Sequence, residues 1–304
     1  MFANEILDMD KIDLISDYKD IKGYRDSFNQ LAGMVFDINF EDWYQKGFWD
    51  DRYICHSFIQ DNVIISNVSV SKMDLMINGL NKTAIQIGTV MTHPEFRGKG
   101  LAGKLMRHVL DIYGHDCDII FLFANNTVTD FYPKYGFESL NESQFQLKYL
   151  STPDKDITLR KLNCSSEEDL ALIKKMVLSR RAVSTQLGII NNLGLFMFYA
   201  INVFPESIYY SQEDDAVIVC QQEGRILNIY DVVSPGHVDL NRLIHRMANK
   251  ETKNVHFHFT PDPFIGETKY EQAWKDINGD KLFVKSNCIL DLKSKFCVPM
   301  LAHA

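Results

Sequence analysis

The spacing of hydrophobic and polar residues along the chain predicts a helical start followed by an antiparallel meander. From residue 14 to residue 35, apolar side chains recur every three or four positions, which is the period of an amphipathic helix. The period then changes to two, which predicts strands over residues 53–60, 63–77 and 84–92. The pair Asn78-Gly79, between the last two strands, is typical of a tight hairpin turn.

An aromatic-rich stretch lies between the helical start and the meander. Its members are Phe40, Trp43, Tyr44, Phe48 and Trp49. The simpler interpretation is a helix pair that covers one side of the sheet. The alternative is that some of these side chains line a substrate pocket.

Pro94 ends the meander, and the pattern then alternates between helix and strand. Residues 101–113 carry an apolar stripe at helical spacing. Residues 118–124 are almost continuously apolar, which is typical of a strand buried on both faces. A short helix over residues 129–135 and a final strand or hairpin over residues 137–150 complete this half.

The polar, aperiodic segment 151–156 predicts a domain boundary. We therefore expect two domains, residues 1–150 and residues 151–304. In the second, Ser165 and Glu168 have the spacing of a capping box, and residues 187–204 form an apolar helical run. Three strands, a loop, a helix and further strands follow. This order repeats that of the first half with different residues, which indicates a second copy of one fold.

Composition limits the classes of function. The 304 residues include 46% hydrophobic and 24% charged residues, which is ordinary for a globular protein. The net charge of −8 and the lack of any basic run argue against a nucleic-acid partner and mildly favour a cationic one, such as an amine. No apolar stretch reaches the roughly 18 residues that span a bilayer, so we expect no membrane partner. Six cysteines without a C-x-x-C pair, and no secretory leader, predict reduced thiols in the cytoplasm.

The loop after the third strand carries the clearest chemistry. Three glycines occur within six residues, at positions 98, 100 and 103, and a helix begins among them. A helix start offers unpaired N–H groups and the positive end of the helix dipole, which together favour an anion. Arg97, Lys99 and Lys104 add positive charge, so a pyrophosphate is the expected guest. The alternative is a glycine-rich turn that binds no ligand.

Two spaced motifs occur in this half. The first is Arg97-x-x-Gly100-x-Ala102, preceded by Pro94-Glu95-Phe96, and the second is Asn125 with the run from Tyr132 to Gly136-Phe137. They resemble the [Q/R]-x-x-G-x-[G/A] and N…Y-x-x-x-G-F patterns of the GNAT acetyltransferase superfamily. The resemblance implies an α+β fold with a central mixed, mostly antiparallel sheet flanked by helices. The layout of the whole chain resembles tandem GNAT proteins with one active and one degenerate copy.

The resemblance also implies the co-substrate and its contacts. Acetyl-CoA would bind without a metal, its pantetheine arm along the backbone of the third strand and its pyrophosphate on the loop. The implied coenzyme-binding residues are Val90, Met91, Thr92, Arg97, Gly98, Lys99, Gly100, Leu101, Ala102, Gly103 and Asn125. Tyr132 would donate a proton to the departing thiolate, because a phenol with a pKa near 10 stays protonated at pH 7.

The expected activity is acetyl transfer to a primary amine of a small molecule or peptide. The alternatives are a non-catalytic acyl-CoA sensor and a transferase of another acyl group. The candidates for the general base are His56, Asp74, His93 and Glu95. None is assigned, because a base acting through water needs no fixed partner. The acceptor and the oligomeric state are not predicted. The second half has a single glycine in its corresponding loop (234–237), so we expect it to close the substrate cleft or fix specificity rather than bind coenzyme.

Overall fold

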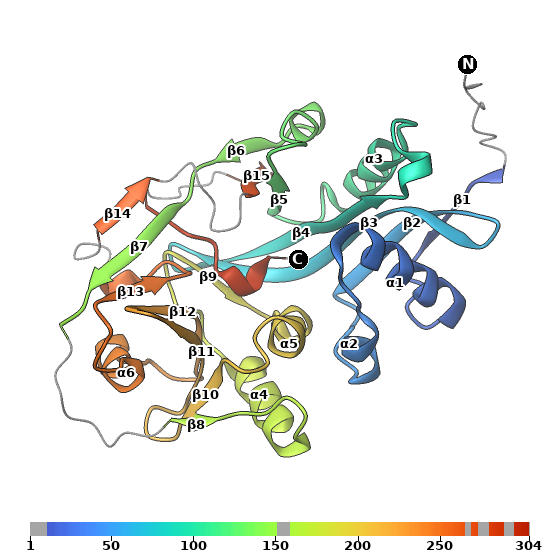
Figure 1. The fold of residues 1–304 in the computed structure, drawn as a ribbon. Coiled ribbons are helices and arrows are strands. Elements are labelled where there is room, and N and C mark those ends of the chain that lie inside the picture. The colour runs from blue at the N-terminus through green and yellow to red at the C-terminus, as the bar shows by residue number, and fades with distance from the viewer. Residues whose placement is uncertain (1–10, 151–158, 265–268, 273–279, 289–294, 304) are drawn as a thin grey trace.

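The computed structural model describes residues 11–150, 159–264, 269–272, 280–288 and 295–303, which form two sheets with helices packed against them (Figure 1). The strand order of the first sheet is β1-β2-β3-β4-β5-β15-β6, and β9 also pairs with β3. The order of the second sheet is β14-β7-β13-β12-β11-β10-β8. Both sheets are mostly antiparallel, with β4–β5 and β12–β13 paired in parallel. This confirms the predicted mixed, mostly antiparallel α/β class.

The elements of the first half are β1 (Asp13–Ser16), α1 (Lys22–Phe36), α2 (Glu41–Gln45), β2 (Tyr53–Gln60), β3 (Val63–Ile77), β4 (Leu80–Thr92), η2 (Pro94–Phe96), α3 (Leu101–Tyr113), β5 (Ile119–Asn125), η3 (Tyr132–Tyr135), β6 (Glu138–Leu140) and β7 (Ser143–Lys148). Those of the second half are β8 (Arg160–Lys161), α4 (Glu167–Ser179), β9 (Leu187–Ile190), α5 (Leu193–Asn202), β10 (Ile208–Ser211), β11 (Ala216–Glu223), β12 (Ile226–Val233), α6 (Leu240–Met247), β13 (Asn254–Phe257), η4 (Asp262–Phe264), β14 (Lys269–Gln272), β15 (Asp280–Ser286) and η5 (Met300–Ala302).

Local sequence accounts for most of the meander. Strands β2 and β3 have the predicted bounds, and helix α3 covers the predicted residues. At the β3–β4 turn, Asn78 and Gly79 have φ angles of 49° and 79°, and Asp61 and Asn62 at the β2–β3 turn have 50° and 63°. Two consecutive positive φ values are the signature of the type I′ turns that match the twist of a hairpin.

Three local predictions were wrong. Residues 13–16 form strand β1, paired with β2, instead of the start of a helix, and residues 187–190 form strand β9, paired with β3. In both places the pairing with a distant strand outweighs the helical spacing of apolar residues. The cap of α4 is Ser166, whose hydroxyl accepts from the N–H of Asp169, one residue beyond the predicted box.

The two halves exchange a strand. Strands β6 and β7 do not form a hairpin: β6 pairs with β15 in the first sheet, and β7 lies between β13 and β14 in the second. In return, β15 from near the end of the chain lies between β5 and β6. The predicted boundary at 150/151 adjoins residues 151–158, outside the described residues, and stays a prediction. Strand β7, before this boundary, belongs to the second sheet, and β15, after it, belongs to the first.

The halves also share a hydrophobic core. Buried side chains of α1 and α2, among them Phe28 and Trp43, form one cluster with Phe196 and Met197 of α5. The indole Nε1 of Trp43 donates to the carbonyl of Gly194 at 2.8 Å. A Cβ at Gly194 would lie 2.8 Å from the carbonyl oxygen of Phe48, so glycine permits this close approach. Within the described residues, no helix has the length and apolarity needed to cross a membrane.

Candidate active site

Strands β4 and β5 separate at their carboxyl ends. Their parallel pairing joins residues 84–87 to residues 119–122 and ends there. The remaining backbone of β4, which includes Val90, Met91 and Thr92, therefore continues past the last paired position. Polar backbone groups that leave a ladder need another partner, because burying them unpaired is unfavourable. The separation is the opening that the resemblance implies for the pantetheine arm.

A β-bulge lies at this opening. In the ladder of β3 and β4, Ser69 pairs with Gly88 and Asn67 pairs with Met91, so β4 contains one extra residue. Thr89, within the bulge, has a φ of 47°. The buried side-chain amide of Asn67 donates to the Thr89 carbonyl at 2.8 Å. This hydrogen bond holds the bulge and so sets the course of the backbone that follows it.

The glycine loop is shaped to admit an anion. Gly98 and Gly100 have φ angles of 74° and 78°, and a Cβ at either would meet no atom within 4 Å. Gly100 is the N-cap of α3 and offers no side-chain hydrogen bond. The first N–H groups of α3 therefore remain available at an open surface, together with the positive end of the helix dipole. This arrangement fits a pyrophosphate.

Two exposed cations flank the loop. The Nε of Arg97 donates to the Thr92 carbonyl at 3.1 Å, which ties the loop back to the end of β4. The Nζ of Lys99 lies 4.9 Å from the centroid of the Phe96 ring, within cation–π range. Both charges lie beside the start of α3, where they strengthen its attraction for an anion.

Leu101, Ala102 and Gly103 form the first turn of α3, and only their backbone can serve a ligand directly. Leu101 is buried in the core and Ala102 is half-buried. A Cβ at Gly103 would lie 2.5 Å from the hydroxyl oxygen of Tyr135. A side chain at Gly103 would therefore displace the hydroxyl end of Tyr135, which is half-buried against α3.

Asn125 is the last residue of β5 and is exposed. Its Oδ1 accepts a hydrogen bond from the N–H of Thr127 at 3.0 Å, which turns the chain away from the sheet. In the ladder it stands opposite Asp280 of β15. Its position at the carboxyl end of β5, facing the separated end of β4, is the one that the resemblance implies.

Tyr132 is a buried phenol held by aromatic rings. It lies in η3, and its ring centroid is 5.1 Å from that of Phe131 and 5.6 Å from that of Phe283. Burial, reinforced by the negative charge of Asp280, raises the pKa of Tyr132 to about 12. The side chain therefore stays protonated over the whole physiological range, which suits a proton donor.

The four candidate bases lie on different elements, namely β2, β3 and the loop at η2. His56 is buried on β2, 2.8 Å from the Ser16 hydroxyl, and burial lowers its pKa to about 4. Asp74 accepts a hydrogen bond from Asn191. His93 accepts from the N–H of Glu95 at 3.4 Å in the loop. No general base is assigned among them.

A pocket lined in part by the aromatic-rich stretch lies on the face of the sheet that α1 and α2 cover. It has a volume of about 140 Å³. We call it the aromatic pocket; its lining residues are Phe36, Ile38, Phe40, Trp43, Tyr53, Thr89, Leu195 and Phe198. Phe40 and Trp43 of the aromatic-rich stretch line the pocket, and Phe48 and Trp49 do not, although all four are buried in the core. No local sequence signal could have identified the contribution of Leu195 and Phe198 from α5.

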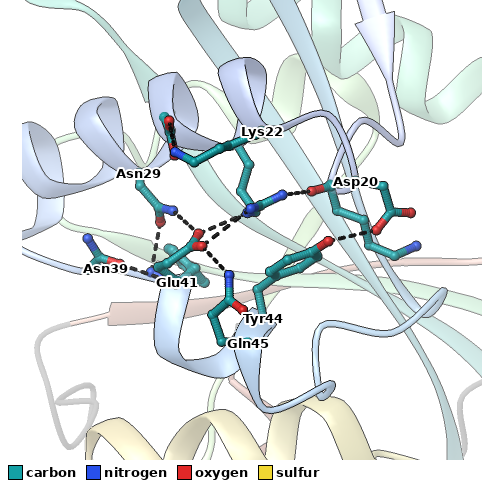
Figure 2. Close-up of polar contacts among 11 residues, drawn as sticks. Asp20, Lys22, Asn29, Asn39, Glu41, Tyr44 and Gln45 are labelled. Atoms are coloured by element: carbon teal, nitrogen blue, oxygen red, sulfur yellow. Dashed lines mark hydrogen bonds and ion pairs between the residues drawn. The ribbon is translucent and has the colours of Figure 1, made fainter.

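A polar network fixes the corner between α1 and α2 that carries this pocket (Figure 2). The guanidinium of Arg25 binds both carboxylate oxygens of Glu41, at 2.8 and 3.3 Å, and lies over the Tyr44 ring. The Oδ1 of Asn29 accepts from the N–H of Phe40 at 2.8 Å. These contacts hold α2 against α1, so the aromatic walls are fixed from outside the pocket.

In the second half, the loop after β12, a strand paired in parallel with β13, differs from the glycine loop after β4. The loop after β12 borders a cavity of about 350 Å³ that is lined in part by residues 181–183. The N–H of Arg181 donates to the Ser234 carbonyl at 2.9 Å, so the connection from α4 lies across the end of β12. The expectation that this half binds no coenzyme stays a prediction.

Comparison with known proteins finds a family match in the first half and a likeness in fold over both halves. Residues 21–140 match the model of the acetyltransferase (GNAT) domain. No curated protein matches the chain. A conserved protein of unknown function from Enterococcus faecalis V583, named a probable N-acyltransferase, is similar at a TM-score of 0.60 and 16% identity, over 90% of this chain and 72% of that one.

Two further solved structures share the fold. A GCN5-related N-acetyltransferase from Kribbella flavida has a TM-score of 0.57 and 16% identity, over 92% of this chain and 72% of that one. Eis1 from Mycobacterium abscessus has a TM-score of 0.56 and 14% identity, over 90% of this chain and 73% of that one. Both halves are thus covered by the likeness in fold. Residues 21–140 match the acetyltransferase (GNAT) domain, and this match, with the likeness in fold, supports an acyltransferase.

Proposed function

We propose that the protein transfers the acetyl group of acetyl-CoA to a primary amine of a small molecule or peptide. The observation that supports this most is the opening between β4 and β5, with an uncapped helix start and open glycines at its mouth. A buried, protonated phenol lies in the segment that follows β5. The proposed binding surface and the proposed acid thus come from segments that follow β4 and β5, two neighbouring strands of one sheet.

The loop holds the coenzyme by its phosphates. The N–H groups from Gly98 to Gly103 bind the pyrophosphate at the loop, where a Cβ at Gly98 or Gly100 would meet no atom within 4 Å, and the charges of Arg97 and Lys99 attract the anion from solution. Along β4, the backbone of Val90, Met91 and Thr92 pairs with the pantetheine arm. Asn125 contacts the coenzyme from the end of β5.

The residues of the chain divide the chemistry between them. Bound acetyl-CoA supplies an activated acetyl group, whose carbonyl carbon the amine attacks as the carbon–sulfur bond breaks. A backbone N–H of β4 donates to the carbonyl oxygen and stabilises the negative charge that develops there. Tyr132 donates a proton to the sulfur as it leaves, the amine loses its proton to water, and the solvent returns a proton to the Tyr132 phenolate. The products are an acetamide and the coenzyme thiol, so atoms and charge balance.

The test is release of free coenzyme thiol from acetyl-CoA in the presence of primary amines, with mass spectrometry of the acetylated product. Turnover that depends on both acetyl-CoA and the amine supports the proposal. Binding of acetyl-CoA without turnover for any amine would instead favour the sensor. Turnover only with a longer acyl-CoA would favour transfer of a different acyl group.

A further inference from the structure

The aromatic pocket begins beside the proposed reaction centre. Thr89, one of its lining residues, directly precedes Val90 and Met91 on β4, the strand proposed to hold the thioester. The other lining residues come from α1, α2 and the loop between them, from β2 and from α5. The pocket therefore extends from the bulge of β4 into the α1–α2 face, away from the glycine loop and α3.

The walls of the pocket carry no charged side chain. No Asp, Glu, Lys, Arg or His is among its lining residues, all of which the structure describes. Its two hydroxyls, on Tyr53 and Thr89, lie 2.7 Å apart and bind each other. A charged group placed there would lose its hydration and meet no ionised partner, only the faces of aromatic rings, whereas an apolar group would gain by leaving water.

The volume sets the size of the guest. An apolar cavity of about 150 Å³ in a protein core holds one benzene molecule. The aromatic pocket, at about 140 Å³, is of the same size. A phenyl ring or a branched alkyl group fits, and a sugar or a nucleoside does not.

The second half supplies one wall. Leu195 and Phe198 lie on α5, and the Phe198 ring stacks on Phe40 with centroids 5.1 Å apart. The hydrogen bond from Trp43 to Gly194 fixes α5 against α2. The pocket is therefore complete only when both halves are present.

We infer that the acceptor is an amine that carries one benzene-sized apolar group, which occupies the aromatic pocket while the amine nitrogen reaches the β4 bulge. This inference rests on the proposed acetyl transfer for its reaction, but the pocket binds the apolar group independently of turnover. The acyl group of the donor could supply the same apolar chemistry, so the test separates the two sources.

The first experiment compares kcat/KM for four primary amines with acetyl-CoA. We expect 2-phenylethylamine and 3,3-dimethylbutylamine to exceed ethylamine by about 10- to 100-fold, the range that burial of such a group in an apolar pocket gives. The fourth amine, (2-aminoethyl)trimethylammonium, has the shape of dimethylbutylamine but carries a fixed charge. We expect it to react no better than ethylamine. A preference for it would mean that the aromatic walls bind a cation, which would overturn the inference.

Two variants alter the pocket in opposite directions. Leu195→Trp fills it and should bring the ratio of 2-phenylethylamine to ethylamine close to one. Phe198→Ala enlarges it and should shift the preference toward tryptamine. Val203→Trp, at the exposed end of α5, is the matched control and should leave the ratio unchanged. If Leu195→Trp reduces the use of benzoyl-CoA and leaves the amine ratio intact, the apolar group belongs to the donor and the inference is wrong.

A binding measurement separates this inference from the proposed function. The methyl resonances of Ile38 and Leu195 should shift when 2-phenylethylamine is added without coenzyme, and should not shift with ethylamine. Shifts without turnover for any amine would preserve the pocket and refute the acetyl transfer. If turnover does not depend on the apolar group and the methyl resonances do not shift, the proposed acetyl transfer stands and the proposed role of the aromatic pocket is refuted.

Discussion

Tyr132 packs its ring against Phe283, with centroids 5.6 Å apart and planes inclined by 41°, although the two residues lie in opposite halves of the sequence. Phe283 is on β15, the strand that returns to the first sheet between β5 and β6. The proposed acid is therefore supported by the last described strand of the chain. A strand from the second half completes the active-site side of the first.

Removing the Tyr132 hydroxyl tests its proposed role. Tyr132→Phe should lower kcat by about 10²- to 10⁴-fold, the usual contribution of a positioned acid, with little change in the affinity for acetyl-CoA. The ring and its packing are kept, so stability should change little. Steady-state kinetics and calorimetric binding provide both numbers. Tyr230→Phe, another buried phenol but in the second sheet, is the control. Full turnover by Tyr132→Phe would remove this residue from the mechanism.

The exchanged strands predict that the protein unfolds as one unit. Phe283→Ala should lower the free energy of unfolding by about 3–5 kcal/mol, because it leaves a cavity beneath Tyr132. Urea unfolding followed by tryptophan fluorescence and by circular dichroism should give one coincident transition. Trp43 and Trp49 lie in the shared core, so their fluorescence reports on that core, whereas dichroism reports on both sheets. Two separated transitions would show that the halves are independent.

The buried amide of Asn67 should position the β4 backbone. Asn67→Ala leaves the Thr89 carbonyl without this donor, and the Ser57 hydroxyl loses its acceptor, 2.8 Å away. We expect a loss of about 1–3 kcal/mol in stability and a clear fall in kcat. Asn228→Ala, which removes a buried partner of His258 in the second sheet, should reduce stability alone. Equal kcat for both variants would show that the bulge does not matter to the reaction.

Buried histidines predict a loss of stability in mild acid. Burial lowers the pKa of His56 and of His258 to about 4 and that of His303 to about 3, from an ordinary value near 6.5. The unfolded chain then binds more protons than the folded one, so stability is full above pH 6.5 and falls as the pH drops toward 4. Unfolding midpoints in urea at pH 7.5, 6 and 5 test this. His56→Gln should flatten the decline, and an unchanged slope would contradict the assignment.

Local signals in the sequence predicted the parts of the fold that short segments determine. Asn78-Gly79 specifies its own turn, and the alternating pattern of β2 and β3 needs no distant partner to be recognised. Strands β1 and β9 escaped prediction because their few residues become strands through pairing with β2 and β3. The exchange of β7 and β15 is likewise decided by contacts between the two halves.

The candidate site divides in the same way. The glycine loop and Tyr132 could be proposed from motifs, because a helix start and a phenol carry their chemistry locally. The aromatic pocket could not, because Phe40, Thr89 and Leu195 come from three segments that only the folded core brings together.

The most direct test of the account is calorimetric titration of the full chain with acetyl-CoA, recording the stoichiometry. We predict one coenzyme per chain, with binding abolished in Gly100→Glu, because a carboxylate would enter the open side of the loop. Gly79→Glu is the matched control, since its φ of 79° is close to the 78° of Gly100 and its surroundings are equally open; it should bind normally. Two coenzymes per chain, or normal binding by Gly100→Glu, would contradict the placement of the cofactor site.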